Sequence, residues 1–369
     1  MVTGDHPLTA SSIAKKIGLL VNPTRDELAA SLGVDGSSID ESDVRAVVIH
    51  GGQIDQMTES DWANVVSKKE IVFARTSPEQ KLQIVKEFAK AGHVTAMTGD
   101  GVNDAPALKH AAIGVAMGKN GSDVAREAAD IVLLDDNFAS IVVGIREGRL
   151  LFSNLKKSIA YTLAHAMPEV YPVILFAAVG WPSPINSILI LCIDLLTELV
   201  PATSLAFEEP ESSIMQIRPR NVNTDKLVSL SLLSYSYLQI GTFISIGCLF
   251  VYFSTFSYYG VSFDDINNNN GDYFSSNPVG DFTTSSGVTY SSSQQAAILA
   301  TAQAGYYITL VSCQATHVFV CKTNLVSIFS HGVFGNMITN IGVFIAIGLG
   351  CTVVYAPFLQ KIDGAADTI

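Results

Sequence analysis

The sequence has few charged residues and no excess of positive charge. Charged residues make up 15% of its 369 positions, apolar residues make up 48%, and the net charge is −12. A chain without a basic surface is a poor candidate for nucleic-acid binding. Most of the charge lies in the first 157 positions, and long apolar runs follow. Length and composition therefore predict two units, a soluble one and then a membrane one.

The sequence also lacks the cysteine patterns of disulfide or zinc proteins. It has five cysteines, none in a C-x-x-C pair, and all lie in or beside apolar runs. We expect them to act as small apolar side chains within the membrane unit. No signal peptide precedes the first unit, so we expect that unit in the cytosol.

Short apolar runs alternate with helical patterns in the first unit, which we place at residues 1–150. A helix is predicted over 78–91, with Ser77 as its N-cap and Pro78 in its first turn. This alternation favours an α/β fold with a parallel sheet covered by helices. The expected strands are 45–50, 70–75, 93–97, 113–118 and 131–135.

The most specific motif is MTGDGVNDAP, at residues 97–106. It places Asp100 and Asp104 where an apolar strand ends in a polar turn, beside Asn103. Ligands of parallel α/β sheets gather at such strand ends, and Mg²⁺ prefers carboxylate and phosphate oxygens. The motif therefore predicts a Mg²⁺ and phosphate site.

Two further groups could complete that site. Thr3, Gly4 and Asp5 offer a hydroxyl and backbone amides to an anion, and Lys81 offers a cation. Each has a simpler interpretation, because a TGD turn can be a capped turn and a lysine in a first helical turn is often solvated.

The second unit, 151–369, holds five segments of the length that spans a bilayer. Lysine and arginine in the connections 207–227 and 321–332 place those connections on the cytosolic side. The polar loop 254–295 then faces the exterior, and we expect it to be flexible. The expected spans are 158–179, 185–207, 228–253, 296–320 and 333–358.

Three acids lie inside the first two spans: Glu169, Asp194 and Glu198. A charge at mid-membrane costs roughly 3 kcal/mol on insertion scales, so buried acids there indicate an ion pathway. The alternative is a set of protonated acids that bond the helices together. Thr197 lies beside them, and Pro168 and Pro172 should free backbone carbonyls as further ligands.

Longer blocks of the sequence include MVTGDHPLTA, VFARTSPEQK, MTGDGVNDAPALKHA and GRLLFSNLKKSIAYTL. These blocks resemble consecutive segments of P-type cation-transporting ATPases, and are most similar to the sodium/potassium and proton/potassium pumps. The resemblance implies a partial phosphorylation domain of the haloacid-dehalogenase-like, Rossmann-type fold, followed by an all-α transmembrane bundle. It assigns phosphate contacts to Thr3 and Gly4, charge neutralisation to Lys81, and Mg²⁺ binding to Asp100. Asn103 and Asp104 would complete the site.

The same resemblance implies ATP-driven transport of monovalent cations, with Mg²⁺ and ATP as cofactors, in the plasma membrane. Glu169, Asp194 and Glu198 would hold the cations with Thr197 and Gln314. His165 replaces a serine of the sodium pumps and could be a ligand, an internal cation or a packed side chain. His317 replaces an aspartate of the third sodium site, which makes a third sodium doubtful. A β-type subunit could bind the exoplasmic loop.

The family's phosphate-accepting aspartate lies in a DKTGT segment, which is absent from this sequence. Its nucleotide-binding and actuator domains and several spans are also not found. We therefore expect these residues to form the C-terminal portion of a pump and to lack ATPase activity by themselves. The alternatives are a truncated, non-catalytic pump fragment, a proton/potassium-type pump, and a phosphatase with membrane anchors.

Overall fold

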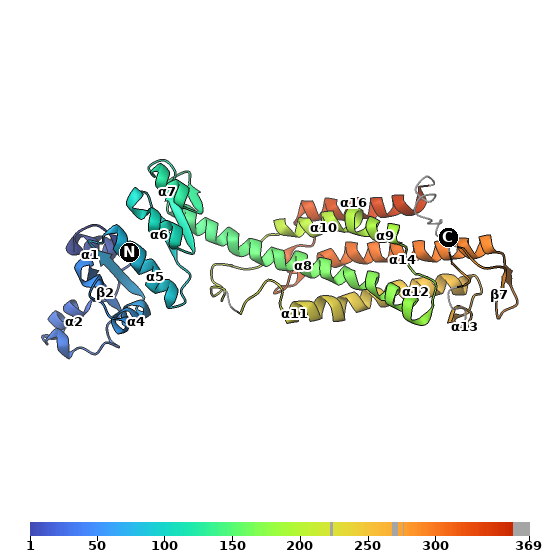
Figure 1. Cartoon of the computed structure of the whole chain (residues 1–369), viewed down its shortest axis with the longest axis horizontal. Helices are drawn as coiled ribbons and strands as arrows, with labels where there is room; N and C mark the ends of the chain where they lie inside the picture. Colours follow the sequence, from blue (N-terminus) through green and yellow to red (C-terminus); the bar gives the residue numbers. More distant parts are fainter. Residues whose placement is uncertain (222–223, 268–271, 276, 357–369) are drawn as a thin grey trace. The chain divides into compact units, whose positions relative to one another are not determined.

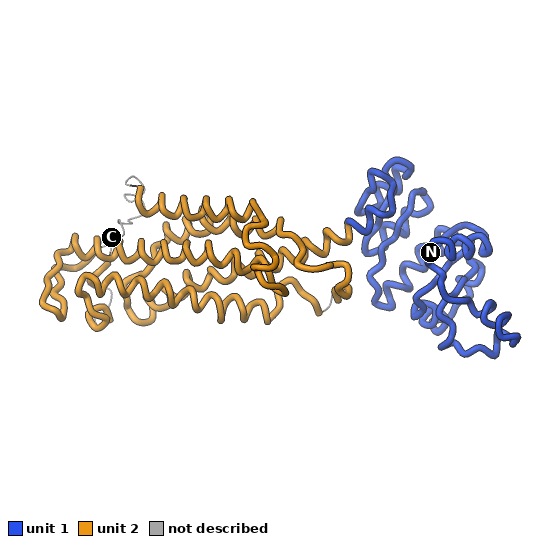
Figure 2. The backbone as a smooth tube through the Cα atoms, turned by 180° about the vertical axis from the view of Figure 1, so that it is seen from behind, with its two compact units in different colours: residues 1–143 blue, residues 144–369 orange. Residues whose placement is uncertain are grey.

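The computed structural model describes residues 1–369 except 222–223, 268–271, 276 and 357–369. The chain divides into two compact units, residues 1–143 and residues 144–369 (Figure 2). We placed the boundary at residue 150, and the helix that carries the first span begins before that residue, at Ala139.

The first unit contains two three-stranded sheets, whereas the sequence suggested one. Their strand orders are β1-β3-β2 and β4-β5-β6, and all pairs are parallel. β4 begins at Ala96, later than expected, where its pairing with β5 begins. It also ends later, because Thr98 and Gly99 pair with β5 and the following turn starts at Asp100. The strands are β1 (Val2–Thr3), β2 (Ala46–His50), β3 (Glu70–Ala74), β4 (Ala96–Gly99), β5 (Ile113–Met117) and β6 (Ile131–Leu133).

Helices cover these sheets and supply their cores. α5 (Pro78–Lys90) begins as predicted, because Ser77 Oγ accepts a hydrogen bond from the Gln80 amide. Its buried Ile84 packs against Phe73 of β3 in one core cluster. The other helical segments are α1 (Pro7–Lys16), α2 (Arg25–Leu32), η1 (Gly36–Ser38), α3 (Gly51–Ile54), α4 (Glu59–Ser67), η2 (Val102–Asp104), α6 (Ala105–His110) and α7 (Asp123–Ala128).

The second unit is a helical bundle with five helical stretches long and apolar enough to span a membrane, counted over the described residues (Figure 1). They are Ala139–Val179, Ser187–Phe207, Leu230–Tyr258, Ser292–Cys321 and Met337–Tyr355. Each overlaps an expected span. The elements are α8 (Ala139–Val179), α9 (Ser187–Cys192), η3 (Ile193–Glu198), α10 (Leu199–Ser204), η4 (Leu205–Phe207), α11 (Leu230–Leu233), η5 (Ser234–Gly241), α12 (Thr242–Tyr258), α14 (Ser292–Cys321), α15 (Ile328–His331) and α16 (Met337–Tyr355).

α14 is the most enclosed of these helices. In the most apolar 18-residue segment of α14, 56% of the residues are buried by protein. In the corresponding segment of α8 the share is 22%. Apolar side chains that point outward on the other helices, such as Phe250 and Phe344, are exposed to the surroundings of the bundle. An apolar outer surface is the expected surface of a protein whose solvent is lipid.

The loop between α12 and α14 is folded where the structure describes it, so the expectation of a flexible loop is wrong for those residues. It contains α13 (Phe263–Asn267) and a hairpin of β7 (Phe282–Thr283) and β8 (Thr289–Tyr290). Phe274 is fully buried, and its ring lies 5.4 Å from that of Phe256 and 5.3 Å from that of Phe282. These aromatic residues give a polar sequence its own small core.

Candidate functional site

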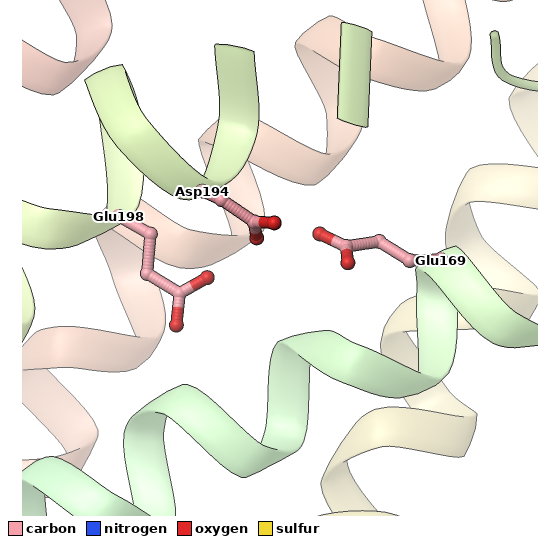
Figure 3. Close-up of side chains that lie close together, drawn as sticks. All are labelled: Glu169, Asp194 and Glu198. Atoms are coloured by element: carbon pink, nitrogen blue, oxygen red, sulfur yellow. The ribbon is translucent and has the colours of Figure 1, made fainter. Parts of the chain in front are cut away.

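The structure brings together the three acids that the sequence places in the first two spans. Each of Glu169, Asp194 and Glu198 offers a carboxylate oxygen, and the three oxygens lie within 4.8 Å of one another. The carboxylates of Glu169 and Asp194 point toward each other, with that of Glu198 beside them (Figure 3). Three carboxylates this close repel one another, so a cation or protons must lie among them.

An irregular helical segment sets the direction of two of these acidic side chains. Asp194 and Glu198 lie on η3, which is a π-helical segment inserted between α9 and α10. π-helical insertions are rare and occur often at functional sites, because they turn side chains away from the ordinary helical positions. The sequence shows Asp194 and Glu198 four residues apart but gives no signal for this insertion.

Two polar residues complete the wall beside Glu198. The Thr197 hydroxyl lies 3.1 Å from both the Ile193 carbonyl and Gln314 Oε1. Gln314 Nε2 donates to Glu198 Oε2 at 3.5 Å. Thr197 and Gln314, both named from the sequence, are therefore in contact with the acid cluster across two helices.

The proline-freed carbonyls of α8 are less available than the sequence suggested. The Pro168 carbonyl accepts a hydrogen bond of 2.6 Å from the Tyr306 hydroxyl. The Ala164 carbonyl faces Gly241, where an added Cβ would lie only 2.8 Å away. Protein groups therefore cover both carbonyls. Neither Tyr306 nor Gly241 was identified from the sequence.

His165 is fully buried beside the acids. Its Nε2 lies 3.3 Å from Nδ1 of His317, and its Nδ1 lies 3.8 Å from Glu198 Oε1. His317 in turn lies 3.2 Å from the Cys321 sulfur. The structure thus pairs two histidines that the sequence named separately, and Tyr161 packs edge-on against His165 with ring centroids 4.4 Å apart.

In the first unit, Lys81 forms an ion pair with Asp104, at 2.7 Å from Nζ to Oδ1. The other Asp104 oxygen accepts from the Gly101 amide at 3.3 Å. Both oxygens of Asp104 are therefore engaged by the protein. Asp100 and Asn103 are exposed at the same strand end, and the Asp100 backbone carbonyl accepts from the Ser122 amide at 2.8 Å.

Thr3, Gly4 and Asp5 form a turn at the end of β1. The Asp5 amide donates to Thr3 Oγ1 at 3.1 Å, and the Thr3 carbonyl accepts from the Thr76 amide at 3.1 Å. Gly4 and Asp5 are exposed. Backbone hydrogen bonds thus hold the turn to the end of β3. A Cβ added at Gly4 would have no other atom within 4 Å, so there is open space beside this residue.

A buried ionic cluster at one end of the bundle was not predicted. Lys322 Nζ lies 3.4 Å from Glu208 Oε1, and Lys157 Nζ lies 2.8 Å from Glu211 Oε1. Lys157 also donates to the Lys322 carbonyl at 2.6 Å, which joins the two pairs. In the sequence these charged residues flank apolar runs. Lysines at such positions indicate which side of the membrane a connection faces, but they do not indicate which acids they contact.

Comparison with known families assigns the chain to a class. A family model described as "Cation transporting ATPase, C-terminus" matches residues 182–367. A second model, "haloacid dehalogenase-like hydrolase", matches residues 1–112. The chain belongs to the cation-transporting ATPase family, with a haloacid-dehalogenase-like unit before the helical bundle.

The relatives it matches include alpha subunits of sodium/potassium-transporting ATPases. It is 45% identical over 335 residues to sodium/potassium-transporting ATPase subunit alpha-4 of Rattus norvegicus, covering 90% of this chain and 32% of that protein. It is 44% identical to subunit alpha-B of Artemia franciscana, covering 98% of this chain and 36% of that one. It is also 44% identical to subunit alpha-3 of Homo sapiens, covering 97% of this chain and 35% of that protein. The chain thus spans about a third of the length of these relatives.

Proposed function

We propose that this chain is the ion-binding and Mg²⁺/phosphate-binding portion of an ATP-driven pump for monovalent cations, of the sodium/potassium-exchanging type. The proposal places the pump in the plasma membrane. The observation that carries it is the cluster of Glu169, Asp194 and Glu198 between two spans of a chain that belongs to this family.

The cluster suits a small hard cation. Carboxylate, hydroxyl and amide oxygens replace water around such an ion, and Thr197 and Gln314 supply the uncharged donors. Glu198 is buried and Asp194 is exposed, so the site is open on one side. A site that is open on one side can load and release an ion.

In the first unit, the donor set suits Mg²⁺ with a phosphate. Asp100 presents an exposed carboxylate that takes part in no ion pair among the described residues. Mg²⁺ is commonly bound by one or two carboxylates together with phosphate oxygens and waters. When bound, Mg²⁺ would neutralise phosphate charge. The Thr3 hydroxyl, the exposed Gly4 and Asn103 would contact the phosphate.

Lys81 and Asp104 have a joint role in this proposal. Their ion pair holds the Lys81 ammonium at the end of β4, where an anion would approach. Asp104 then positions Lys81, and its own carboxylate becomes a metal ligand only if that pair opens. The phosphate-accepting aspartate of the family would belong to a DKTGT segment, which this sequence does not contain.

α8 connects the unit with the proposed Mg²⁺/phosphate site to the helices with the proposed cation site. It runs without interruption from Ala139 to Val179 and carries Glu169. In two-state transporters, phosphate and metal contacts bias one arrangement of such a connecting element over another. We propose that movement of α8 changes the distance of Glu169 from Asp194 and Glu198, and so the affinity for the cation.

The relatives are named as alpha subunits, which implies a second subunit. We propose that such a partner binds the folded loop between α12 and α14, which presents α13 and the β7–β8 hairpin. Loss of partner capture on deletion of that hairpin would support this assignment.

The test of the function is equilibrium binding of radioactive rubidium ions to the full chain in lipid nanodiscs. Glu198→Gln should weaken binding by about 30-fold, the effect of removing one member of a buried charged contact. Glu209→Gln is the matched control, because Glu209 is an exposed acid outside the span. Equal affinities for rubidium in both variants would contradict the proposal.

A further inference from the structure

The connection between α14 and α16 has an inverted distribution of polarity. Its apolar side chains point outward: Phe329 is 86% exposed, Phe334 74% and Leu325 73%. Its charged residue, Lys322, is fully buried. A loop in water shows the opposite pattern, and soluble proteins rarely expose neighbouring large apolar residues.

Three polar side chains of this connection, Lys322, His331 and Asn336, are paired within the protein. Lys322 Nζ donates to the carbonyls of Gly332 and Val333 at 3.2 and 2.8 Å and pairs with Glu208. His331 Nε2 lies 3.1 Å from Glu208 Oε1, and Asn336 Nδ2 donates to Glu208 Oε2 at 3.0 Å.

Several backbone groups of the connection are also paired within the protein. Glu211 accepts from the amides of Asn324 and Leu325 at 2.8 and 2.7 Å, and Asn340 Nδ2 donates to the Phe334 carbonyl at 2.9 Å. Internal pairing of backbone polar groups is what a segment in lipid requires, and a segment in water does not need it.

The connection also folds back beside a membrane span. The ring of Phe334 lies 6.0 Å from that of Phe319, which belongs to α14 two residues before its end at Cys321. Met337, 68% exposed, is the first residue of α16. The outward apolar surface therefore continues directly into two helices that face lipid, and no acidic residue occurs between positions 321 and 338.

We propose that residues 323–337 lie in the interfacial layer of the bilayer. Leu325, Phe329, Phe334 and Met337 insert among lipid acyl chains, and the Glu208–Lys322 pair holds the segment from the protein side. The occupant of this surface is lipid, because the surface is continuous with the spans and carries no net negative charge. The inference concerns membrane contact alone and stands whether or not the chain transports cations.

The test is photolabelling of the full chain in nanodiscs that contain phosphatidylcholine with a diazirine on its acyl chain. Three apolar residues of similar exposure allow a comparison within one molecule: Phe329, Phe344 of α16, at 76%, and Leu8 of the first unit, at 78%. Mass spectrometry should find lipid adducts on peptides containing Phe329 and Phe344, and none on the peptide containing Leu8.

Two outcomes would overturn the proposal. One is labelling of the Phe344 peptide without labelling of residues 323–337, while this segment remains open to a water-soluble label. The other is protection of this segment from both labels, which would mean that a protein, such as a second copy, covers it. As a variant test, Phe329→Asp should reduce lipid labelling of the segment about tenfold, because an acidic side chain resists transfer to hydrocarbon. Leu8→Asp should leave it unchanged.

Discussion

The ammonium group of Lys81 lies 2.7 Å from Asp104 Oδ1, and this ion pair joins α5 to η2, the turn that follows β4. Both side chains are largely buried, with exposed fractions of 18% and 9%. A buried ion pair contributes little compared with an apolar pair, but removal of one partner leaves an uncompensated charge. The pair therefore fixes the geometry of the strand end more than it stabilises the fold.

We predict that Lys81→Met destabilises the first unit by about 3 kcal/mol, because Asp104 then stays buried without a cation. Hydrogen exchange of the β4 and α5 amides measures this change. The double variant Lys81→Met/Asp104→Asn should recover most of the loss. If the β4 and α5 amides of the single variant exchange as slowly as those of the wild type, the loss of Lys81 does not destabilise the unit and the prediction is wrong.

Gly99 is predicted to be intolerant of any side chain. A Cβ there would lie 2.5 Å from the Asp104 Cβ, so Gly99→Ala should cost roughly 1–3 kcal/mol through overpacking. Gly148→Ala is the control, because no atom lies within 4 Å of its added Cβ and alanine favours the helix. Urea unfolding should show the first variant less stable than the wild type, and the second at least as stable.

Asp136 should make the loop at residues 118–120 sensitive to acid. The hydrogen bonds that its carboxylate accepts from the backbone amides, that of Lys119 foremost, hold the pKa of Asp136 below its ordinary value. A lowered pKa in the folded state means stabilisation that is complete above the ordinary pKa and disappears as the pH falls through the lowered one. Amides 118–120 should therefore lose exchange protection in acid, and Asp136→Asn should remove that pH dependence. Unchanged pH dependence in the variant would contradict this.

The ionic cluster at the end of the bundle should be essential for its stability. Lys322 is fully buried and Glu208 is 3% exposed, so Lys322→Met leaves a buried carboxylate with fewer donors. We expect a loss of about 3–5 kcal/mol, measured as thermal unfolding in nanodiscs. Lys226→Met, which removes a lysine outside the described ion pairs, should change the unfolding temperature little. Similar unfolding temperatures for the two variants would show that the ionic cluster does not stabilise the bundle.

Features that depend on local sequence could be predicted. The N-cap at Ser77 and the five spans follow from residue type and apolar length, because a cap or a span is defined within one segment. The grouping of the three acids in the spans could also be anticipated, since acids in apolar helices are too costly to face lipid.

Features that depend on long-range packing could not. His165 and His317 are 152 residues apart, and Tyr306 reaches the Pro168 carbonyl across 138 residues. No local pattern reports such contacts. The same limit explains Asp104: its place after a strand suggested a metal ligand, whereas its contact with Lys81 depends on how α5 packs against η2.

The central claim is that Glu169, Asp194 and Glu198 hold a monovalent cation together. The most direct measurement is a structure of the full chain determined with thallium ions, whose anomalous scattering identifies the ion. The account predicts one thallium peak bounded by the three carboxylates, with Thr197 and Gln314 beside it. Carboxylates turned toward lipid, or thallium bound only elsewhere in the bundle, would contradict it.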